Sequence, residues 1–481
     1  MSTSHSATTA PLAELLAAGS PILKLAEVFR AQGHALYLVG GTVRDALLGR
    51  TGYDYDFATD AAPEETHELV RPAASAVWLQ GMKFGTVGAE IDGIRMEITT
   101  FRTERYEADS RHPEVEFASD IAIDLSRRDF TVNAMAVGLP DKEAFDPFGG
   151  RADLKAKMLR TPIDPDQSFA DDPLRMLRAF RFVAQLDFDI APEVLESITR
   201  SKDRLKTVSA ERIRDELSRL AVGEAPAKAL TLADRTGITD LFLPELSALK
   251  LEQDPVQKHK DVFRHTLTVV EQTPPDLLVR LAALLHDIGK PKTRRIDAEG
   301  VTFHHHEVEG AKMARRRLKE LRYPNDVVEA VGDLIFLHHR FHTYALGWSD
   351  SAVRRYVRDT GALLEPLNSL VRADCTTRRA EKAKRLAARM DELEERITAL
   401  AAEEELHRMR PALDGTQIGA YLGIPPGPEI GEAWRFLLEQ RIELGVLSED
   451  EACKKLDRWA RERGIEPAGV RVAPKEKKKS E

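Results

Sequence analysis

The chain has 481 residues, of which 42% are hydrophobic and 31% are charged, and its formal net charge is −9. This composition excludes a wholly disordered chain, and the acidic balance excludes nucleic-acid binding through overall charge, though not through local basic patches. The N-terminus lacks the features of a signal peptide, and no apolar run reaches the roughly 18 residues of a membrane-spanning helix. The two cysteines, Cys375 and Cys453, fit a reducing compartment, so we expect a cytoplasmic protein.

The first part of the chain is predicted to mix helices and strands, because its apolar residues follow both periods. The hairpin is the clearest element, since Asp92-Gly93 forms a favoured two-residue turn. In chain order the pattern predicts a helix over 21–32, a strand over 35–41, a helix over 42–49, a strand over 53–59, a hairpin over 84–101 and a mobile loop over 102–118.

Helical periodicity dominates from about residue 165 onward. The charged tail over 471–481 is expected to be disordered. We therefore predict an α+β fold, with a mixed N-terminal head around a small sheet and a mainly α-helical body. The main helices predicted in the body cover 174–186, 210–222, 279–290 and 376–409.

Two aspartates on a predicted strand give the first chemical signal. Asp54 and Asp56 are two residues apart, so their side chains point to the same face. Neighbouring carboxylates repel each other unless a cation lies between them, and oxygen ligands of this kind suit Mg²⁺. The alternative is a solvated edge strand. Glu97, in the predicted hairpin, is a weaker candidate for a third carboxylate.

A glycine pair precedes these aspartates, between a predicted strand and a predicted helix. Gly40 and Gly41 allow backbone N–H groups to approach a phosphate, and the following helix adds its positive N-terminal dipole. Arg44 is placed to neutralise the same phosphates, and Asp45 is better placed to hold Arg44 than to contact an anion. Without the aspartates, the pattern would equally fit a plain strand–turn–helix.

Three segments together resemble one family. They are GGTVRDALLGRTGYDYDFAT (40–59), RRDFTVNAMA (127–136) and DDPLRMLRAFRF (171–182). Their motifs, in this order and spacing, resemble the class II CCA-adding tRNA nucleotidyltransferases and bacterial poly(A) polymerases. The resemblance is close over about residues 20–250 and looser beyond them. Asp171 stands where the family usually has glutamate, which is a conservative departure.

The resemblance implies roles for individual residues. Asp54 and Asp56 would hold catalytic Mg²⁺, and the segment from Gly40 to Asp45 would hold the triphosphate of CTP or ATP. Asp129 and Asn133, expected four residues apart on a helix, would face the ribose together with Arg128. Asp172 and Arg175, expected on one helix face, would read the base. Arg178 and Arg181, in the same motif, complete the predicted nucleotide-binding set.

A second constellation lies in the helical body. His286-Asp287 ends a strongly apolar helical run, and further histidines and an aspartate surround it in sequence. A single histidine in this place is usually a satisfied core residue, but the recurring pattern resembles the HD phosphohydrolase module. That resemblance implies a divalent transition metal, Ni²⁺, Co²⁺ or Mn²⁺, because imidazole ligands suit such ions. The implied ligands are His265, His286, Asp287, His306, His338 and Asp374. His304 and His305 are alternatives to His306, and His339 is an alternative to His338.

Two predicted helices carry concentrated positive charge. Residues 312–322 and residues 378–389 each hold six basic residues and one acidic residue. Phosphate contacts of this kind give affinity without sequence readout, so a folded RNA is the expected partner, although a solvated helix face fits equally well. The residues that we expect to contact RNA are Lys312, Arg315, Arg316, Arg378, Arg379 and Lys382.

The sequence therefore predicts an enzyme that adds or repairs the 3′ CCA end of tRNA from CTP and ATP and releases pyrophosphate. Alternatives within the family are a poly(A) polymerase and a CC- or A-adding enzyme. A metal-dependent phosphohydrolase acting on RNA or nucleotide ends, and a pure RNA-binding module, are the alternatives from other classes. Neither a membrane nor a particular oligomeric state is indicated.

The resemblance also implies a division into domains. It comprises a flexible lead-in over 1–20, a nucleotidyltransferase head over 21–160, a helical neck over 161–250 that binds the base and RNA, an HD-type helical domain over 251–400, a C-terminal helical domain over 401–470 and a disordered tail over 471–481.

Overall fold

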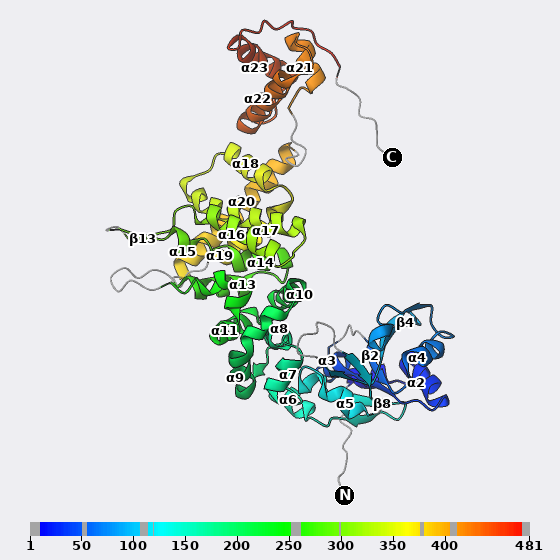
Figure 1. Ribbon diagram of the computed structural model, residues 1–481. Coiled ribbons are helices and arrows are strands. Elements are labelled where there is room, and N and C mark those ends of the chain that lie inside the picture. The colour runs from blue at the N-terminus through cyan, green and yellow to red at the C-terminus, as the bar shows by residue number, and fades with distance from the viewer. Residues whose placement is uncertain are drawn as a thin grey trace. The chain divides into compact units, whose positions relative to one another are not determined.

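The computed structural model describes residues 10–50, 55–105, 114–118, 120–251, 261–297, 300–375, 380–404 and 411–473. The chain forms two compact units, which are described separately (Figure 1). The first unit contains residues 1–248 and 320–323, and the second contains residues 249–319 and 324–481. Within the described ranges, no helix is both long and apolar enough to cross a membrane.

A seven-stranded sheet organises the head, in the order β3-β4-β5-β2-β1-β8-β9. Strands β2 and β5 pair in parallel, and the other neighbours are antiparallel. The hairpin of β4 and β5 turns at Asp92-Gly93 as predicted, with both residues at positive φ. The strands are β1 (Leu36–Val39), β2 (Tyr55–Thr59), β3 (Ala76–Trp78), β4 (Thr86–Ile91), β5 (Ile94–Thr100), β8 (Ala136–Leu139) and β9 (Glu143–Phe145).

Helices cover one face of this sheet and part of the other. Val87, Ala89 and Ile91 of β4 are buried in alternation on the face where α2 (Pro21–Ala31) and α4 (Pro63–Val70) pack. On the opposite face, a second core joins Val39 and Ala58 to α5 (Ile121–Ser126) and to the turn after it. The positions of β4 and β5 that alternate with the buried ones are only partly buried or exposed, so this part of the second face stays open among the described residues.

The segment predicted as a mobile loop, 102–118, is not all loop. Strands β6 (Arg102–Arg105) and β7 (Glu114–Phe117) pair in antiparallel register, and residues 106–113 lie outside the described part. Backbone hydrogen bonds form such a ribbon without a continuous apolar face, so its polar sequence gave no strand pattern. Arg102 ties the ribbon to the carbonyl oxygen of Phe84.

Further helices and one pair of short strands complete the first unit. The pair α8 and α10 carries strong apolar faces, matching two predicted helices within a residue at each end. The further elements are α1 (Ala10–Leu15), α3 (Gly40–Leu47), α6 (Gly150–Ala156), α7 (Pro165–Asp171), α8 (Arg175–Leu186), α9 (Pro192–Ser201), α10 (Ala210–Ala221), α11 (Pro226–Thr236), α12 (Pro244–Ser247), and the short parallel pair β10 (Met158–Leu159) and β11 (Asp189–Ile190).

In its described residues the second unit is helical apart from one short hairpin, which confirms the predicted α+β class. The long helix predicted over 376–409 is present as α20, and residues 376–379 and 405–410 lie outside the described part. Its elements are α13 (Val262–Gln272), α14 (Leu277–Leu285), α15 (Lys290–Thr293), β12 (Arg295–Asp297), β13 (Gly300–Thr302), α16 (His306–Glu320), α17 (Asn325–Leu337), α18 (Asp350–Thr360), α19 (Leu364–Asp374), α20 (Ala380–Glu404), α21 (Gly415–Leu422), α22 (Pro428–Leu444) and α23 (Glu449–Arg461).

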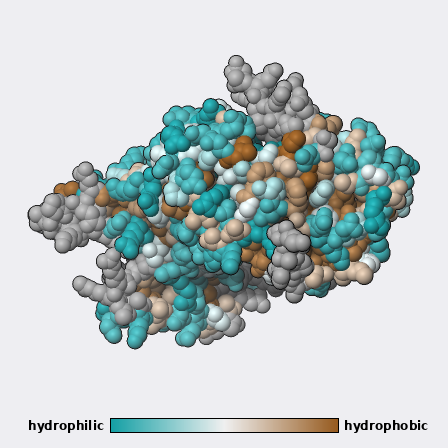
Figure 2. All heavy atoms as spheres, turned by 90° about the horizontal axis from the view of Figure 1, so that it is seen from below, coloured by the Kyte–Doolittle hydropathy of each residue, from teal (hydrophilic) through white to brown (hydrophobic). Residues whose placement is uncertain are grey.

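The C-terminal helices α21, α22 and α23 enclose their own apolar cluster, which includes Ile418, Leu437 and Leu456. On the face that Figure 2 displays, hydrophilic residues dominate and hydrophobic residues occur in scattered patches.

Gly150, the first residue of α6, allows this helix to pack closely against Thr131 and Met135. A Cβ at this position would lie 2.7 Å from Met135 Cγ and against the carbonyl oxygen of Thr131. We expect Gly150→Ala to lower the free energy of unfolding by about 3 kcal/mol, the upper range for overpacking a core. Gly149→Ala is the matched control, because Gly149 has a φ of +73° but open space around it, and its cost should be only about 1 kcal/mol. Urea unfolding followed by circular dichroism compares the two, and equal losses would contradict the steric argument.

Candidate active site and metal cluster

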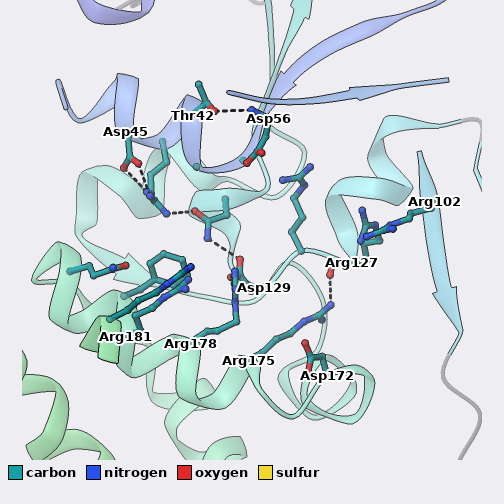
Figure 3. Close-up of a pocket in the computed structure, with 18 residues that line it drawn as sticks. Thr42, Asp45, Asp56, Arg102, Arg127, Asp129, Asp172, Arg175, Arg178 and Arg181 are labelled. Carbon is teal, nitrogen blue, oxygen red and sulfur yellow. Dashed lines mark hydrogen bonds and ion pairs between the residues drawn. The ribbon is translucent and has the colours of Figure 1, made fainter. Parts of the chain in front are cut away.

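A cavity of about 630 Å³ opens in the head, and all of the predicted nucleotide-binding residues line it (Figure 3). Its walls come from the start of α3, from β2, from the turn after α5 and from α8. The predicted residues on its wall are Gly40, Gly41, Arg44, Asp45, Asp56, Arg128, Asp129, Asn133, Asp172, Arg175, Arg178 and Arg181. The fold thus brings together three motifs that are up to about 130 residues apart.

The glycine pair is the beginning of helix α3 itself, rather than a turn before it. Gly40 has a φ of +68°, and a Cβ there would lie 2.6 Å from Arg128 Nη1 and 3.7 Å from Asp56 Oδ2. Any side chain at this position would therefore occupy the cavity between the helix and Asp56. The N–H group of Gly40 donates to the carbonyl oxygen of Met135 at 3.3 Å. The N–H groups that follow it in the first helical turn have no partner within the helix, so they are suited to an anion.

Arg44 is held in place by Asp45 and Asn133. Asp45 accepts hydrogen bonds from Arg44 Nε and Nη2, both at 2.8 Å, and Asn133 Oδ1 accepts one from Arg44 Nη1 at 2.7 Å. This geometry agrees with the expectation that Asp45 holds Arg44. The guanidinium keeps further N–H groups for a ligand.

Asp129 and Asn133 touch, but the prediction that they lie on one α-helix is wrong. Asp129 precedes a 3₁₀ turn, Thr131–Asn133, which brings the two side chains together because the turn is tighter than an α-helix. Asn133 Nδ2 donates to Asp129 Oδ1 at 2.8 Å, and Arg178 Nε donates to Asp129 Oδ2 at 2.8 Å. Burial disfavours the charged carboxylate, but Arg178 and Asn133 outweigh it and hold the pKa of Asp129 well below its usual range.

Asp172 and Arg175 also do not share a helix, which corrects the second helical prediction. Asp172 has an extended backbone between α7 and α8, and Arg175 is the first residue of α8. Pro173 explains the break, since the residue before a proline is disfavoured in the helical region. Both side chains nevertheless line the cavity.

Internal contacts fix the orientation of both groups. Arg212 Nη2 donates to Asp172 Oδ2 at 2.9 Å. Arg175 Nη1 donates to Ser168 Oγ at 2.9 Å, and Arg175 Nη2 donates to the carbonyl oxygen of Arg127. These contacts leave lone pairs on the carboxylate of Asp172 and N–H groups on the guanidinium of Arg175. Both residues can therefore still form hydrogen bonds with a base.

Several residues of the cavity were not predicted from the sequence. Phe182 is the most informative, because the guanidinium carbons of Arg44, Arg178 and Arg181 lie 5.1, 5.7 and 4.3 Å from its ring centroid. Within an apolar helix pattern Phe182 gave only a core signal. Burial and the neighbouring Arg178 lower the pKa of Arg181 to about 10. The other missed residues are Thr42, Arg102, Arg127, Gln185 and Arg219.

Of the two aspartates expected to bind Mg²⁺, the structure describes one. Asp54 lies outside the described residues, whereas Asp56 is half-buried on β2, its backbone N–H donating to Thr42 Oγ1 at 3.2 Å. Glu97, the weaker third candidate, pairs directly with Asp56 in the parallel register of β2 and β5. Directly paired residues point to one face of a sheet, so the fold places this exposed glutamate beside Asp56.

The second unit gathers all six predicted HD ligands around the end of α14. Two groups can each hold a metal ion, and in each group the ligand atoms lie within 4.8 Å of one another. The first group is His265, His286 and Asp374, and the second is Asp287, His306 and His338. Asp287 connects the groups, since its Oδ2 lies 3.3 Å from His286 Nε2 and its Oδ1 lies 3.6 Å from His306 Nε2.

Backbone carbonyls orient these rings. The Nδ1 atoms of His286, His306 and His338 face the carbonyl oxygens of Ala283, Phe303 and Ile335 at 2.7, 2.9 and 2.5 Å. Their Nε2 atoms are thereby left for a metal. Burial opposes protonation of His286, but Asp287 and Asp374 outweigh it and raise its pKa to about 10, whereas burial lowers the pKa of His338 to about 3.

The predicted RNA-contacting residues are less uniform. Lys312 and Arg316 are exposed on α16, but Arg315 donates to Glu329 Oε2 at 2.7 Å and to Asp333 Oδ1 at 2.6 Å. Arg315 therefore forms ion pairs within the protein. This agrees with the alternative interpretation, in which the basic residues form a solvated helix face. Arg378, Arg379 and the side chain of Lys382 lie outside the described part.

Comparisons with known families agree with both constellations. A poly A polymerase head domain matches residues 36–160, a probable RNA- and SrmB-binding site of polymerase A matches residues 187–250, and an HD domain matches residues 262–403. Among solved structures, a CCA-adding enzyme of Bacillus stearothermophilus in complex with CTP superposes with a TM-score of 0.67 and 26% identity. That match covers 92% of this chain and 98% of the other.

Curated relatives differ in how much of their length is shared. An A-adding tRNA nucleotidyltransferase of Deinococcus radiodurans is 34% identical over 88% of this chain and 95% of its own. A CC-adding tRNA nucleotidyltransferase of Thermus thermophilus is 33% identical over 90% and 95%. A CCA-adding enzyme of Bacillus subtilis is 38% identical over 53% of this chain and 62% of its own length. The chain is therefore a nucleotidyltransferase and belongs to the family of tRNA nucleotidyltransferases and bacterial poly(A) polymerases.

Proposed function

We propose that the protein adds or repairs the 3′-terminal CCA of tRNA without a nucleic-acid template, using CTP and ATP and releasing pyrophosphate. The observation that carries this proposal is the single cavity lined by the start of α3, Asp56, Asp129 and Asp172. This one cavity thus contains an anion site, a carboxylate that can bind a metal ion, and side chains that can form hydrogen bonds with a ribose and a base. tRNA, CTP and ATP are the proposed partners, and the cytoplasm is the proposed location.

In the proposed reaction the 3′ hydroxyl of the RNA attacks the α-phosphate of the incoming nucleotide. Mg²⁺ on Asp54 and Asp56, when bound, supplies charge stabilisation for the attacking and leaving oxygens. Arg44 and the N–H group of Gly41 hold the triphosphate, while Gly40, which has no side chain, leaves the space that the triphosphate needs. The hydrogen-bonded pair of Asp129 and Asn133 orients the ribose, and the pocket arginines offset the charge that accumulates on pyrophosphate.

Partial addition is the principal competing function, and it has specific support. The two relatives that share nearly their full length with this chain are named for A addition and CC addition. The CCA-adding relative of Bacillus subtilis shares 62% of its length. We favour complete addition because one pair, Asp172 and Arg175, has the chemistry to accept both cytosine and adenine.

A direct assay separates these activities. Purified protein is incubated with a tRNA that lacks CCA and with one that ends in CC, each with CTP, ATP or both. We expect CC addition from CTP, A addition to the CC end from ATP, and complete CCA from both nucleotides. Asp56→Asn should reduce all three products to background, because the variant loses a carboxylate ligand for Mg²⁺. Addition on only one of the two tRNAs would establish a partial enzyme, and long A tails would establish a poly(A) polymerase.

Base choice should depend on Asp172 and Arg175. Cytosine and adenine each present an amino donor beside a ring-nitrogen acceptor, which matches a carboxylate beside a guanidinium. Guanine and uracil present the opposite order and leave polar groups unpaired, at about 1–3 kcal/mol per contact, or about ten- to a hundredfold in selection.

We therefore expect Asp172→Ala and Arg175→Ala to lose the preference for C and A over G and U. Incorporation of all four nucleotides on one acceptor measures this preference. Arg200→Ala is the control, since Arg200 forms an exposed ion pair with Asp166 outside the cavity. An unchanged preference in both pocket variants would mean that another group reads the base.

We further propose that the HD cluster binds a divalent transition metal such as Ni²⁺, Co²⁺ or Mn²⁺. Four converging imidazoles and two carboxylates favour such an ion over Mg²⁺. Hydrolysis of phosphoesters at RNA or nucleotide ends is the activity that such a centre supports. Of the predicted RNA contacts, Lys312 and Arg316 are the described side chains that remain exposed for tRNA phosphates.

Removal of the cluster tests this second proposal independently. We expect His286→Ala combined with Asp287→Ala to eliminate bound transition metal in elemental analysis, while nucleotide addition persists. His305→Ala is the control, because His305 is an exposed neighbour outside both ligand groups. A wild-type protein that binds none of the three ions and hydrolyses no phosphoester in their presence would leave the cluster without a catalytic role.

A further inference from the structure

A row of four residues crosses the head sheet and ends at the catalytic strand. Trp78 pairs with Gly88, Gly88 with Glu97, and Glu97 with Asp56, on β3, β4, β5 and β2 respectively. Directly paired residues share one face of a sheet, so all four lie on the face that carries Asp56. Neighbouring strands are about 4.8 Å apart, which places Trp78 roughly 14 Å from Asp56 along this row.

The row lies where the second face of the sheet is open. Val87 and Ala89 of β4 are buried on the opposite face, while Glu97 and Arg95 are exposed on this one. Thr86 and Thr99 continue the same face, with their hydroxyl oxygens 3.0 Å apart. Among the described residues, the outer strands β3, β4 and β5 therefore present a polar surface with a single indole at its edge.

Gly88 shapes this surface. The indole of Trp78 lies over the glycine, because a Cβ at position 88 would lie 3.0 Å from Trp78 Cε3 and 3.5 Å from Trp78 Cβ. The ring therefore occupies the gap that the missing side chain leaves, instead of standing out from the sheet edge. Its outer side meets the guanidinium of Arg95, whose Cζ is 5.6 Å from the ring centroid.

The side chain of Arg95 is only weakly held in its position over the ring. Its side chain is 81% exposed, and its Nε lies 3.6 Å from Glu90 Oε2. An exposed ion pair of this length holds a side chain weakly. The guanidinium can thus leave the ring to a planar ligand and turn towards a phosphate beside it.

The reaction indicates which ligand reaches this surface. In the proposed function the triphosphate occupies the start of α3, which follows β1 on one side of β2. The attacking 3′ hydroxyl approaches the α-phosphate opposite to the leaving pyrophosphate, so the RNA arrives from the other side of β2. Strands β5, β4 and β3 form that side, and the open surface is continuous with Asp56 through Glu97.

We propose that this surface receives the 3′ end of the acceptor RNA, with one of its last two bases stacked on Trp78. This inference rests on the proposed nucleotide addition and adds a positioning surface for the acceptor strand. Stacking suits the task, because every base has a π-face and the acceptor end changes with each added nucleotide. Arg95 then contributes a phosphate contact, which carries no sequence information.

Cross-linking tests the contact without turnover. An acceptor RNA with 5-iodouridine at its last or penultimate position is bound to the Asp56→Ala protein, irradiated and mapped by mass spectrometry. We expect the cross-link at Trp78, and we expect Gly88→Ala to reduce it by displacing the ring. A cross-link that maps only outside β3, β4 and β5, or to a second protein chain, would overturn the proposal.

Kinetics provide the second readout. In Trp78→Ala, the KM for the acceptor RNA should rise about tenfold or more, as expected for the loss of one stacked base, while the KM for CTP stays unchanged. Trp78→Phe should restore most of the binding because it retains an aromatic face. Leu79→Ala is the matched control, since Leu79 is the next residue and is 42% exposed.

The outcomes distinguish the two proposals. Wild-type acceptor KM in Trp78→Ala, in a protein that adds nucleotides, would overturn the stacking role and leave the proposed function intact. A wild-type protein that adds no nucleotide would overturn the proposed function, and the cross-link would still report whether RNA binds at Trp78. If Trp78→Ala fails to fold, Trp78→Phe and the cross-link decide.

Discussion

The active-site half of the molecule depends on one buried carboxylate. Asp129 accepts hydrogen bonds from the N–H of Phe130, from Asn133 and from Arg178. Through Asn133 it reaches Arg44 on α3, and through Arg178 it reaches α8. A buried charge is costly unless it is fully paired, so the three elements that carry the groups proposed to bind the phosphates, bind the ribose and read the base are held in one arrangement. Loss of any member would leave the others as uncompensated polar groups.

The same principle orders the second unit, where Asp287 lies between the histidines of both ligand groups and within 2.7 Å of Lys290 Nζ. The two buried carboxylates differ in their partners. Asp129 is surrounded by guanidinium and amide groups, which satisfy it permanently. Asp287 faces imidazoles whose Nε2 atoms point inward, an arrangement that a cation would complete. The two sites thus combine similar burial of a carboxylate with different partners.

The open side of the catalytic strand complements these closed networks. On one side of β2, Gly40 leaves open the space near Asp56 that the proposed triphosphate would occupy, because it has no side chain. On the other side, Gly88 leaves room for an indole to lie on the sheet. The lack of a side chain at Gly40 and at Gly88 therefore defines where the proposed nucleotide and the proposed acceptor RNA can approach Asp56. Rigid strands between them fix the distance, which loops would not do.

The sequence by itself determined the α+β class, the strand that carries Asp56 and the glycine pair before it, because these depend on residue type and local spacing. For the HD cluster the sequence left the choice among adjacent histidines open, and the fold places His306 and His338 with Asp287. The tertiary structure decided which groups meet. Pro173 separates Asp172 from the helix of Arg175, yet Arg212 and Ser168 bring both to the cavity. Phe182 has an ordinary core pattern in sequence and becomes a pocket residue only when Arg44 and Arg181 surround it. The row from Trp78 to Asp56 depends on strand register, which hydrogen bonds between distant segments set and no single segment contains.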